Sequence, residues 1–523
     1  MPPMTDFETF IGQDFGTIAD LIRLHATLRP DNPALRDESR TLTYRELDAL
    51  MNRVAAALQR DGLQVGDALA VCAASSVDYA ALFLGALRAG VAVAPLAPSS
   101  TPASLARMVQ DADAQLLFLD AGTAEVLKEV TGVRRIALDG VNADESFGAW
   151  LAPVGAQPAP VRMEPSTPFN IIYSSGTTGE PKGIVQGHGM RWAHVRRGAK
   201  YEYGPGAVTL LSTPLYSNTT LVVFFPTMAY GGCANLMPKF DAARYLQLAE
   251  QQRVTHTMLV PVQYQRLMAR PDFDRHDLSS FQYKFSTSAP FNAALKADVL
   301  ARWPGGLVEF YGMTEGGGTC ILEAHLHQDK LHTVGQPAEG SDIRLIDEAG
   351  NQVAPGEAGE VVGHSAGMMT GYHRQPEKTR EAEWFDTTGK RFIRTGDIGR
   401  FDAEGFLTLF DRRKDMIISG GFNIYPSDLE AVLRQHPAVL EASVVGVPSQ
   451  EWGETPVGFV VAKEGTERID AQALREWANA QLGKTQRLSQ ILFVDELPRS
   501  AIGKVLKREL RDRLASANPT AGA

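Results

Sequence analysis

The chain of 523 residues has little cysteine, no excess of positive charge and no long hydrophobic run. Its three cysteines, Cys72, Cys233 and Cys320, form no C-x-x-C pair and no metal-ligand spacing, so neither a disulfide framework nor a zinc site is indicated. Lys and Arg number 51 against 61 Asp and Glu, and the formal charge of −10 argues against a general nucleic-acid binder. A small anion is still a plausible ligand, because a local group of amides with a lysine binds phosphate on an acidic protein.

Signals for membrane insertion or secretion are also missing. The first residues, MPPMTDFETFIGQD, contain no basic region followed by an apolar one. The most apolar stretch, ALFLGALRAGVAVAPLAP, is interrupted by Arg88 and two prolines and falls short of a spanning helix. We therefore expect a soluble, cytoplasmic protein with no membrane span and no nucleic-acid partner, present as a monomer or a homodimer.

Length and periodicity predict a chain of several domains. A single hydrophobic core stops growing at about 250–300 residues, so this chain must divide. Residues 42–62 predict a helix, because Thr43 and Glu46 form a capping box ahead of a one-sided apolar pattern. The strand-like DALAVCA and VAVAPLAP enclose another helical segment, and such a βαβ unit indicates a parallel sheet. The same alternation continues through VTLLSTP, CANLMP, VTHTMLVP, YKFSTSAP and GLVEFYG.

The pattern changes at about Arg344 to short strands separated by turns, which indicates a small β subdomain. After DRRKD, a capping box of Ser427 and Glu430, three strands and a helix over residues 470–482 predict a small α+β domain. The fold class is therefore α/β and α+β multidomain. The large N-terminal domain, residues 1–411, would hold two βα-alternating subdomains and the small β subdomain, and residues 412–523 would form the C-terminal domain.

The stretch YSSGTTGEPKG, residues 173–183, has the composition of a phosphate-binding loop. It does not fit the P-loop pattern, because two residues separate Gly179 from Lys182 and a glycine follows the lysine. Glycines allow the backbone amides to turn inward, while hydroxyls and a lysine add donors for a polyphosphate. A flexible surface loop is the alternative. The candidate ligands are Ser174, Ser175, Gly176, Thr177, Thr178, Gly179 and Lys182.

Three further motifs carry residues suited to nucleotide chemistry. In YGMTE, an aromatic residue after a strand can stack on a purine, and Glu315 can hold Mg²⁺ on phosphate oxygens. Asp397, at the end of RTGD, can accept hydrogen bonds from ribose hydroxyls. Lys504, in PRSAIGK, can stabilise charge on an α-phosphate and an attacking carboxylate. Taken singly, each could instead be a solvated surface charge.

The ordered set of glycine-rich loop, YGMTE, RTGD, DRRKD and C-terminal GK resembles the adenylate-forming superfamily over nearly the whole chain. That group includes acyl- and aryl-CoA synthetases, luciferase-like enzymes and peptide-synthetase adenylation domains. The resemblance implies ATP, Mg²⁺ and coenzyme A as cofactors and co-substrates. A fatty, branched or aromatic carboxylic acid would become an acyl-AMP with release of pyrophosphate, and then an acyl-CoA. The C-terminal domain would be mobile, with a hinge at Lys414.

The resemblance also implies a role for each matching residue. The glycine-rich loop would hold the β- and γ-phosphates, Thr314 the α-phosphate and Glu315 the magnesium, while Lys504 would drive adenylation. Adenine would lie between the Tyr311–Gly312 segment and the less closely matching Ser288, Ala289 and Pro290. The ribose would contact Asp397 and Arg412. Coenzyme A would pass Gly420 and Gly421, and Trp452 would either contact it or pack internally.

The acid pocket departs from the family pattern. CoA ligases of this group often carry an aromatic residue and a histidine after the strand, whereas PLYSNTT has Tyr216 followed by Ser217. An aspartate for a substrate amine is missing here, which disfavours an α-amino acid. Asn218 either binds a polar group of the substrate or caps a helix. We expect Gly316 and Gly317 to leave room for the acid.

A carboxylate–CoA ligase is the function that these motifs favour. The first alternative is an acyl-AMP ligase that loads a carrier protein, and the second is a luciferase-like oxygenase. A non-catalytic nucleotide-binding protein is disfavoured, because Glu315, Asp397 and Lys504 are all present.

Overall fold

The structure is a computed structural model that describes residues 6–139, 143–174, 181–412, 415–419, 422–449, 452–463, 465, 469–483, 486–500 and 503–517. The chain forms two compact units. The first comprises Met1–Ile343 with Gly363–Ile393, and the second comprises Arg344–Val362 with Arg394–Ala523. The boundary between residues 411 and 412 stays a prediction, as does the hinge at Lys414, which lies outside the described residues.

Local signals in the sequence place the first helices and strands of the first unit. Helix α3, Tyr44–Arg60, begins at the predicted capping box, in which the Thr43 amide donates to Glu46 Oε2 over 2.8 Å. Helix α4, Val77–Ala89, ends at Gly90, whose φ of 74° is the left-handed conformation that favours glycine. Strands β3, Ala68–Cys72, and β4, Ala92–Pro95, on either side of α4 are parallel. The predicted βαβ unit is confirmed.

An eight-stranded sheet has the order β19-β9-β8-β4-β3-β5-β6-β7. Its central strands are parallel, while β8 and β9 form an antiparallel pair. Successive residues of β3 enter different cores: Leu69 and Val71 lie in the larger cluster, and Ala68 and Ala70 in the smaller. The remaining strands are β5 (Leu116–Leu119), β6 (Arg134–Ala137), β7 (Glu145–Ser146), β8 (Pro168–Ser174), β9 (Lys182–Gly187) and β19 (Gly371–Tyr372).

A nine-stranded sheet has the order β16-β15-β14-β13-β12-β10-β11-β1-β2, with parallel pairing from β14 to β1. The carboxyl ends of its parallel strands therefore share one edge, where ligands bind in open α/β sheets. The strands are β1 (Pro33–Arg36), β2 (Thr41–Thr43), β10 (Val208–Leu211), β11 (Cys233–Leu236), β12 (His256–Leu259), β13 (Tyr283–Ser286), β14 (Gly306–Tyr311), β15 (Cys320–Glu323) and β16 (Gln336–Pro337).

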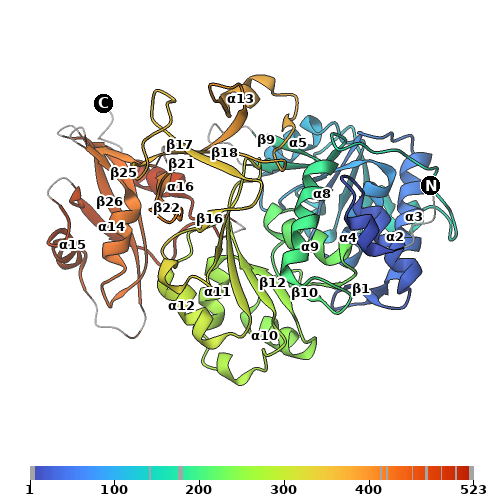
Figure 1. Cartoon of the computed structure of the whole chain (residues 1–523), viewed down its shortest axis with the longest axis horizontal. Helices are drawn as coiled ribbons and strands as arrows, with labels where there is room; N and C mark the ends of the chain where they lie inside the picture. Colours follow the sequence, from blue (N-terminus) through green and yellow to red (C-terminus); the bar gives the residue numbers. More distant parts are fainter. Residues whose placement is uncertain are drawn as a thin grey trace. The chain divides into compact units, whose positions relative to one another are not determined.

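Helices α8, His188–Arg197, and α9, Asn218–Ala229, lie side by side and connect the two sheets (Figure 1). Helix α8 contacts β8 and β9, whereas α9 contacts β10, β11 and β12. One core cluster accordingly includes side chains from both sheets and from the helices α2, α3, α4, α8 and α9. The other helices of the unit include α1 (Phe7–Ile11), α2 (Ile18–Leu28), α5 (Pro102–Asp111), α10 (Ala242–Gln251), α11 (Pro261–Met268), α12 (Ala293–Arg302) and α13 (Pro376–Glu381).

The second unit contains a separate α+β core formed by the C-terminal part of the chain. Its sheet has the order β24-β23-β26-β25, with β27 parallel to β26. Leu429, Leu433, Val444, Val460 and Leu474 pack together in its centre. The elements are β23 (Ile417–Ser419), β24 (Phe422–Ile424), α14 (Pro426–Leu433), β25 (Val439–Ser449), β26 (Gly453–Ala462), α15 (Ala471–Asn479), β27 (Gln490–Phe493) and α16 (Lys507–Ala517).

The predicted capping box of Ser427 and Glu430 is wrong. Helix α14 begins earlier, at Pro426, because proline is favoured in the first turn of a helix. Glu430 instead accepts the Val444 amide over 2.9 Å and forms an ion pair with Lys507 at 2.9 Å.

Strands β17 (Asp342–Ile346), β18 (Gly359–His364) and β21 (Arg391–Phe401) each include residues of both units. The first residues of β21 pair with β20, Glu383–Phe385, and its later residues pair with β22, Leu407–Arg412. These strands are the β region that the sequence predicts after Arg344.

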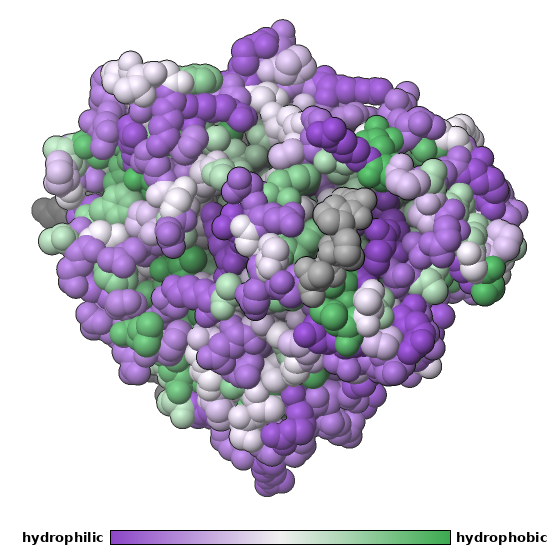
Figure 2. Space-filling view, turned by 45° about the vertical axis from the view of Figure 1, so that its right-hand side comes forward, coloured by the Kyte–Doolittle hydropathy of each residue, from purple (hydrophilic) through white to green (hydrophobic). Residues whose placement is uncertain are grey.

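Searched over the described residues, the chain contains no helix that is both long and apolar enough to cross a membrane. The face in Figure 2 is mostly hydrophilic, with its hydrophobic residues in small separate groups. Scattered exposed hydrophobic residues of this kind are normal on folded proteins.

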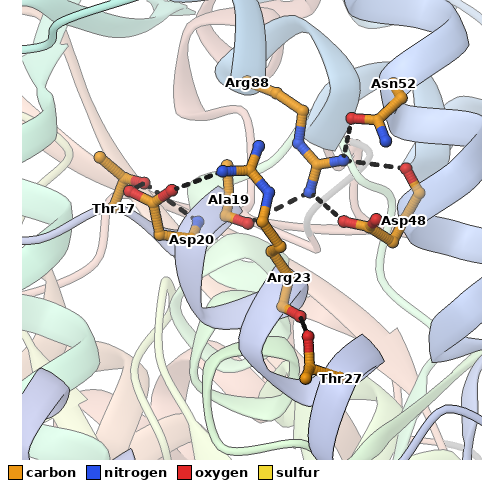
Figure 3. A network of polar contacts seen from close by, with 8 residues as sticks. All are labelled: Thr17, Ala19, Asp20, Arg23, Thr27, Asp48, Asn52 and Arg88. Atoms are coloured by element: carbon orange, nitrogen blue, oxygen red, sulfur yellow. Dashed lines mark hydrogen bonds and ion pairs between the residues drawn. The ribbon is translucent and has the colours of Figure 1, made fainter. Parts of the chain in front are cut away.

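Arg88 joins three helices of the first unit (Figure 3). Its guanidinium contacts Asp48 Oδ1 at 2.7 Å and donates to Asn52 Oδ1 at 2.8 Å, both on α3, and to the Ala19 carbonyl on α2 at 3.2 Å. The Arg88 side chain is only 3% exposed. Because a buried charge is costly without partners, these contacts make the packing of α2, α3 and α4 mutually dependent.

We predict that Arg88→Ala lowers the free energy of unfolding of this unit by about 3 kcal/mol, because it leaves Asp48 without its cation. Arg45→Ala is the control, since Arg45 and Asp31 form a largely exposed pair at 3.0 Å and should cost less than about 1 kcal/mol. Urea denaturation followed by tryptophan fluorescence measures both. Equal losses in the two variants would contradict the prediction.

Candidate functional site

The predicted phosphate loop joins two antiparallel strands. Ser174 at the end of β8 pairs with Lys182 at the start of β9, so the two ends of the loop are held opposite each other. The intervening candidates, Ser175, Gly176, Thr177, Thr178 and Gly179, lie outside the described residues. Their contact with phosphate stays a prediction.

One face of β9 contacts the segments that the sequence predicts to bind nucleotide. Alternation places Lys182, Ile184 and Gln186 on the same face. The Lys182 ammonium lies 5.1 Å from the centre of the Tyr372 ring, and Ile184 packs with Tyr372 in a small core. Gln186 Nε2 donates to the Thr314 carbonyl at 2.6 Å. This strand therefore positions both the loop lysine and the segment containing Thr314.

Tyr372 connects the loop lysine to the predicted magnesium ligand. Its hydroxyl donates to Glu315 Oε1 at 2.9 Å, while its ring faces Lys182. Burial, together with the neighbouring Glu315 carboxylate, raises the pKa of Tyr372 far above its ordinary value, so the hydroxyl stays protonated. The Glu315 carbonyl also accepts the Met369 amide at 2.8 Å. Glu315 is thus held from both its side chain and its backbone.

Tyr372 is not among the residues that the sequence predicts for the site. It lies 57 residues from Glu315, on β19, a strand of two residues. The signal that could have found it is an aromatic residue in a short strand beside the predicted loop, because β19 pairs with β9.

The arrangement fits a magnesium ion held mainly by a nucleotide. Within the part of the chain that the structure describes, no three His, Cys, Asp or Glu side chains group to hold a metal. Mg²⁺ is commonly bound through one or two carboxylates together with phosphate oxygens and water. A single oriented carboxylate, Glu315, suits that mode of binding.

Three predicted segments follow parallel strands of the nine-stranded sheet. PLYSNTT follows β10, the segment containing Ser288 follows β13, and the segment after Tyr311 follows β14. Strands β13 and β14 are direct neighbours, which brings the two predicted adenine segments close together. Ser288 has a φ of 78°, a left-handed conformation that costs a non-glycine residue about 1 kcal/mol. Its hydroxyl lies 2.6 Å from Thr219 Oγ1, which ties this segment to α9.

In the segment PLYSNTT, which the sequence predicts to line the acid pocket, Asn218 does not have the capping role that the sequence allows. The cap of α9 is Ser217, whose hydroxyl accepts the Thr219 amide at 3.3 Å. The capping role considered for Asn218 is therefore wrong. Asn218 Oδ1 instead accepts from Arg191 Nη2 at 2.8 Å. Tyr216 is half-buried, and burial raises its pKa to about 12.

The space expected at Gly316 and Gly317 is also not there. A Cβ on Gly316 would lie 1.9 Å from the Gly367 carbonyl oxygen, and one on Gly317 would lie 2.8 Å from Ile393 Cβ. Both glycines have positive φ, 78° and 81°. Glycine is thus required for backbone shape and close packing rather than to widen a pocket.

The predicted ribose and CoA residues fall in the second unit. Asp397 pairs with Arg412 across β21 and β22, and the Asp397 amide donates to Thr395 Oγ1 at 3.0 Å. Gly420 and Gly421 lie outside the described residues. Trp452 is 51% exposed, so the interpretation as an internally packed tryptophan is wrong.

Lys504 belongs to the second unit, where Ser500 bonds to its backbone. Its amide donates to Ser500 Oγ at 3.2 Å, and its carbonyl accepts the Ser500 amide at 2.8 Å. Gly503 has a φ of 76°, and its carbonyl accepts from Arg499 Nη1 at 2.7 Å. These contacts fix the backbone from which the Lys504 side chain extends.

Comparison with known proteins gives two family matches. Residues 22–373 match the model described as AMP-binding enzyme, and residues 428–504 match the AMP-binding enzyme C-terminal domain. A fatty acid–[acyl-carrier-protein] ligase, ScoC of Streptomyces coeruleorubidus, is 32% identical over 95% of this chain and 96% of its own. A feruloyl-CoA synthase of Amycolatopsis sp is 32% identical over 93% of this chain and 97% of its own.

The fold is also similar to solved structures. ATP-bound MatB from Rhodopseudomonas palustris has a TM-score of 0.84 and 30% identity, over 95% of this chain and 99% of that one. The amide bond synthetase McbA from Marinactinospora thermotolerans has a TM-score of 0.84 and 28% identity, also over 95% of this chain and 99% of that one.

We predict that Tyr372→Phe raises the KM for Mg·ATP or lowers the rate of acid-dependent pyrophosphate exchange by about tenfold. The change removes the hydrogen bond to Glu315, worth about 1.5 kcal/mol, but keeps the ring beside Lys182. Tyr79→Phe is the matched control, because the buried Tyr79 hydroxyl has no hydrogen-bond partner in the described part of the chain. If both variants keep the wild-type KM and rate, Tyr372 does not orient Glu315.

Proposed function

Because the chain belongs to the AMP-binding enzymes, in the acyl-CoA synthetase branch of the adenylate-forming superfamily, we propose that it joins a carboxylic acid to coenzyme A. In the first step, a carboxylate oxygen attacks the α-phosphorus of ATP, the bond to the β-phosphate breaks, and pyrophosphate leaves. In the second step, the CoA thiol attacks the acyl-AMP carbonyl and AMP leaves. The enzyme class is therefore an AMP-forming acid–thiol ligase.

The contact that supports the first step most directly is the one Tyr372 makes with Glu315 while it faces Lys182. A carboxylate and an ammonium at the base of a glycine-rich loop suit a magnesium polyphosphate, because the metal and the lysine share the charge of the leaving pyrophosphate. Thr314, fixed by Gln186, is proposed to contact the α-phosphate. Adenine is proposed to lie against Tyr311 and Gly312 on one side and Ser288 on the other.

The second unit is proposed to complete the chemistry. Lys504 would place its ammonium on the α-phosphate and the incoming carboxylate, and Asp397 and Arg412 would bind the ribose. After adenylation, rotation at Lys414 would withdraw Lys504 and admit the thiol of CoA past Gly420 and Gly421. Trp452 is exposed and could stack on CoA, and we propose it as a contact on that ground.

A carrier-protein thiol is the second candidate acceptor. The observation that favours it is the 32% identity with ScoC, whose name gives an acyl-carrier protein as the acceptor. The similarity to McbA adds an amine as a third acceptor to test. We propose CoA first, because feruloyl-CoA synthase and other CoA ligases match over comparable lengths. The acid is proposed to be fatty, branched or aromatic, without an α-amine.

The chemistry also bears on location. ATP and CoA are supplied in the cytoplasm, and Cys72, Cys233 and Cys320 are free and buried, as in a reducing compartment. We propose a cytoplasmic enzyme.

Pyrophosphate exchange across a panel of aliphatic and aromatic acids tests the adenylation step. At least one acid should give exchange that depends on Mg²⁺. Mass spectrometry with CoA, a phosphopantetheinylated carrier protein or an amine then identifies the acceptor. No exchange with any acid would contradict adenylation, and an acyl-carrier or amide product without acyl-CoA would contradict the choice of CoA.

We predict that Lys504→Ala lowers acid-dependent pyrophosphate release by 10²-fold or more, because oriented charge on a transition state contributes at least about 2.7 kcal/mol. The same variant should convert supplied acyl-AMP and CoA to thioester at a rate close to wild type. Lys507→Ala is the control on the same segment, since Lys507 pairs with Glu430. Wild-type pyrophosphate release by the Lys504 variant would remove this residue from the mechanism.

A further inference from the structure

A buried arginine contacts β9, the strand that holds the Thr314 segment of the candidate adenylation site. Arg191, on α8, is only 1% exposed. Its Nη2 donates to Asn170 Oδ1 at 3.1 Å, to Asn218 Oδ1 at 2.8 Å and to Gln186 Oε1. Among the described residues no carboxylate is bonded to Arg191, and its guanidinium also lies near the rings of Phe169 and Phe225, 5.7 and 5.5 Å from their centres. The guanidinium is thus held by neutral amide oxygens, a group that we call the Arg191 cluster: Arg191, Asn170, Gln186 and Asn218.

The Arg191 cluster has a fixed direction of hydrogen bonding. A guanidinium can only donate, so each amide must turn its oxygen toward Arg191. For Gln186 this leaves Nε2 facing away from Arg191, where it donates to the Thr314 carbonyl at 2.6 Å. Asn170 Nδ2 supports the same orientation by donating to Gln186 Oε1 at 3.0 Å. Through Gln186, the side chain of Arg191 on α8 therefore helps to fix the position of the segment that contains Thr314 and Glu315.

The cluster also reaches the acid side of the site. Asn218 is the first residue of α9, directly after the cap Ser217, and Thr219 contacts Ser288. Arg191 therefore connects three segments that the sequence places far apart: the end of β9, the first turn of α9 and the segment after β14.

Resting on the proposed function, we propose that Arg191 is a positioning residue for adenylation, acting through Gln186 on the Thr314 carbonyl and through Asn218 on the first turn of α9. It contacts neither nucleotide nor acid. Its task is to keep the Thr314 segment in one position relative to the strand that carries Lys182, so that the α-phosphate meets fixed donors when the carboxylate attacks.

A purely structural role does not account for the choice of arginine. Burial lowers the pKa of Arg191 to about 9, so its charge is retained near neutral pH at a desolvation cost. Its Nη1 is buried and has no partner among the residues that the structure describes. An apolar side chain of similar volume would avoid both costs, but it would leave Gln186 free to turn.

Gln186→Glu is the variant that distinguishes an effect on the position of the Thr314 segment from an effect on folding stability. The new carboxylate keeps the size of glutamine and forms an ion pair with Arg191, but it has no N–H for the Thr314 carbonyl. We expect a folded protein whose acid-dependent pyrophosphate exchange falls about tenfold, the effect of one lost hydrogen bond. Thioester formation from supplied acyl-AMP should stay within about twofold of wild type, because adenylation is already complete.

Asn52→Asp is the matched control. It introduces a carboxylate opposite another buried arginine, Arg88, which donates to Asn52 Oδ1 at 2.8 Å. Neither Asn52 nor Arg88 belongs to the Arg191 cluster. This variant should keep wild-type exchange. Arg191→Met should lose at least as much exchange as Gln186→Glu, because it leaves Gln186 free to turn away from the Thr314 carbonyl. If Arg191→Met does not fold, the comparison of Gln186→Glu with Asn52→Asp decides.

The outcomes separate this proposal from the proposed function. A wild-type protein that binds Mg·ATP by calorimetry but exchanges no pyrophosphate with any acid would overturn the function itself. With an active wild type, unchanged exchange in Gln186→Glu would overturn the positioning role. Equal losses in both half-reactions, in step with lost thermal stability, would likewise overturn it and assign Arg191 to folding alone.

Discussion

The alternation of side chains along β9 is the constraint on which the candidate site depends. Lys182, Ile184 and Gln186 share a face because a strand repeats every two residues. On that face the Lys182 ammonium lies over the Tyr372 ring, and Ile184 packs in a small core that includes Tyr372 and Met313. Gln186 donates a hydrogen bond to the Thr314 carbonyl. A shift of one residue in the pairing of β8 with β9 would turn all three side chains to the opposite face. The register of one hairpin therefore sets the distance between the phosphate loop and the segment containing Glu315.

Buried polar groups make that register specific. Hydrophobic packing alone tolerates small shifts, whereas a buried donor without an acceptor costs about 1–3 kcal/mol. Gln186, Asn170 and Arg191 are each less than 2% exposed, and their bonds are satisfied only when β8, β9, α8 and α9 take their observed positions together. Arg88 does the same for α2, α3 and α4. The first unit thus uses buried arginines at two places to fix helices that an apolar core would leave less well defined.

The sequence predicted what depends on local pattern. The capping box of α3 and the parallel pairing of β3 with β4 follow from residues close together in the chain. Features that depend on distant neighbours were missed. The close approach of the Gly367 carbonyl to Gly316 cannot be read from the sequence. Ser427 has the pattern of an N-cap, but α14 begins at Pro426, two residues before the start that such a cap predicts. Tyr372 gains its significance from Glu315, 57 residues away, and Arg191 contacts Asn218, 27 residues away, as well as the nearby Gln186.

The acid segment shows why a missing motif residue need not mean a missing interaction. Where CoA ligases of this group often have a histidine, this chain has Ser217, and the serine caps α9. The polar contact at this position comes instead from α8, through Arg191 and Asn218. Because Asn218 must turn its oxygen toward the guanidinium, the face of its amide that remains carries only N–H donors. The proposed contact of Asn218 with the acid would therefore favour an acid that offers a hydrogen-bond acceptor at this position.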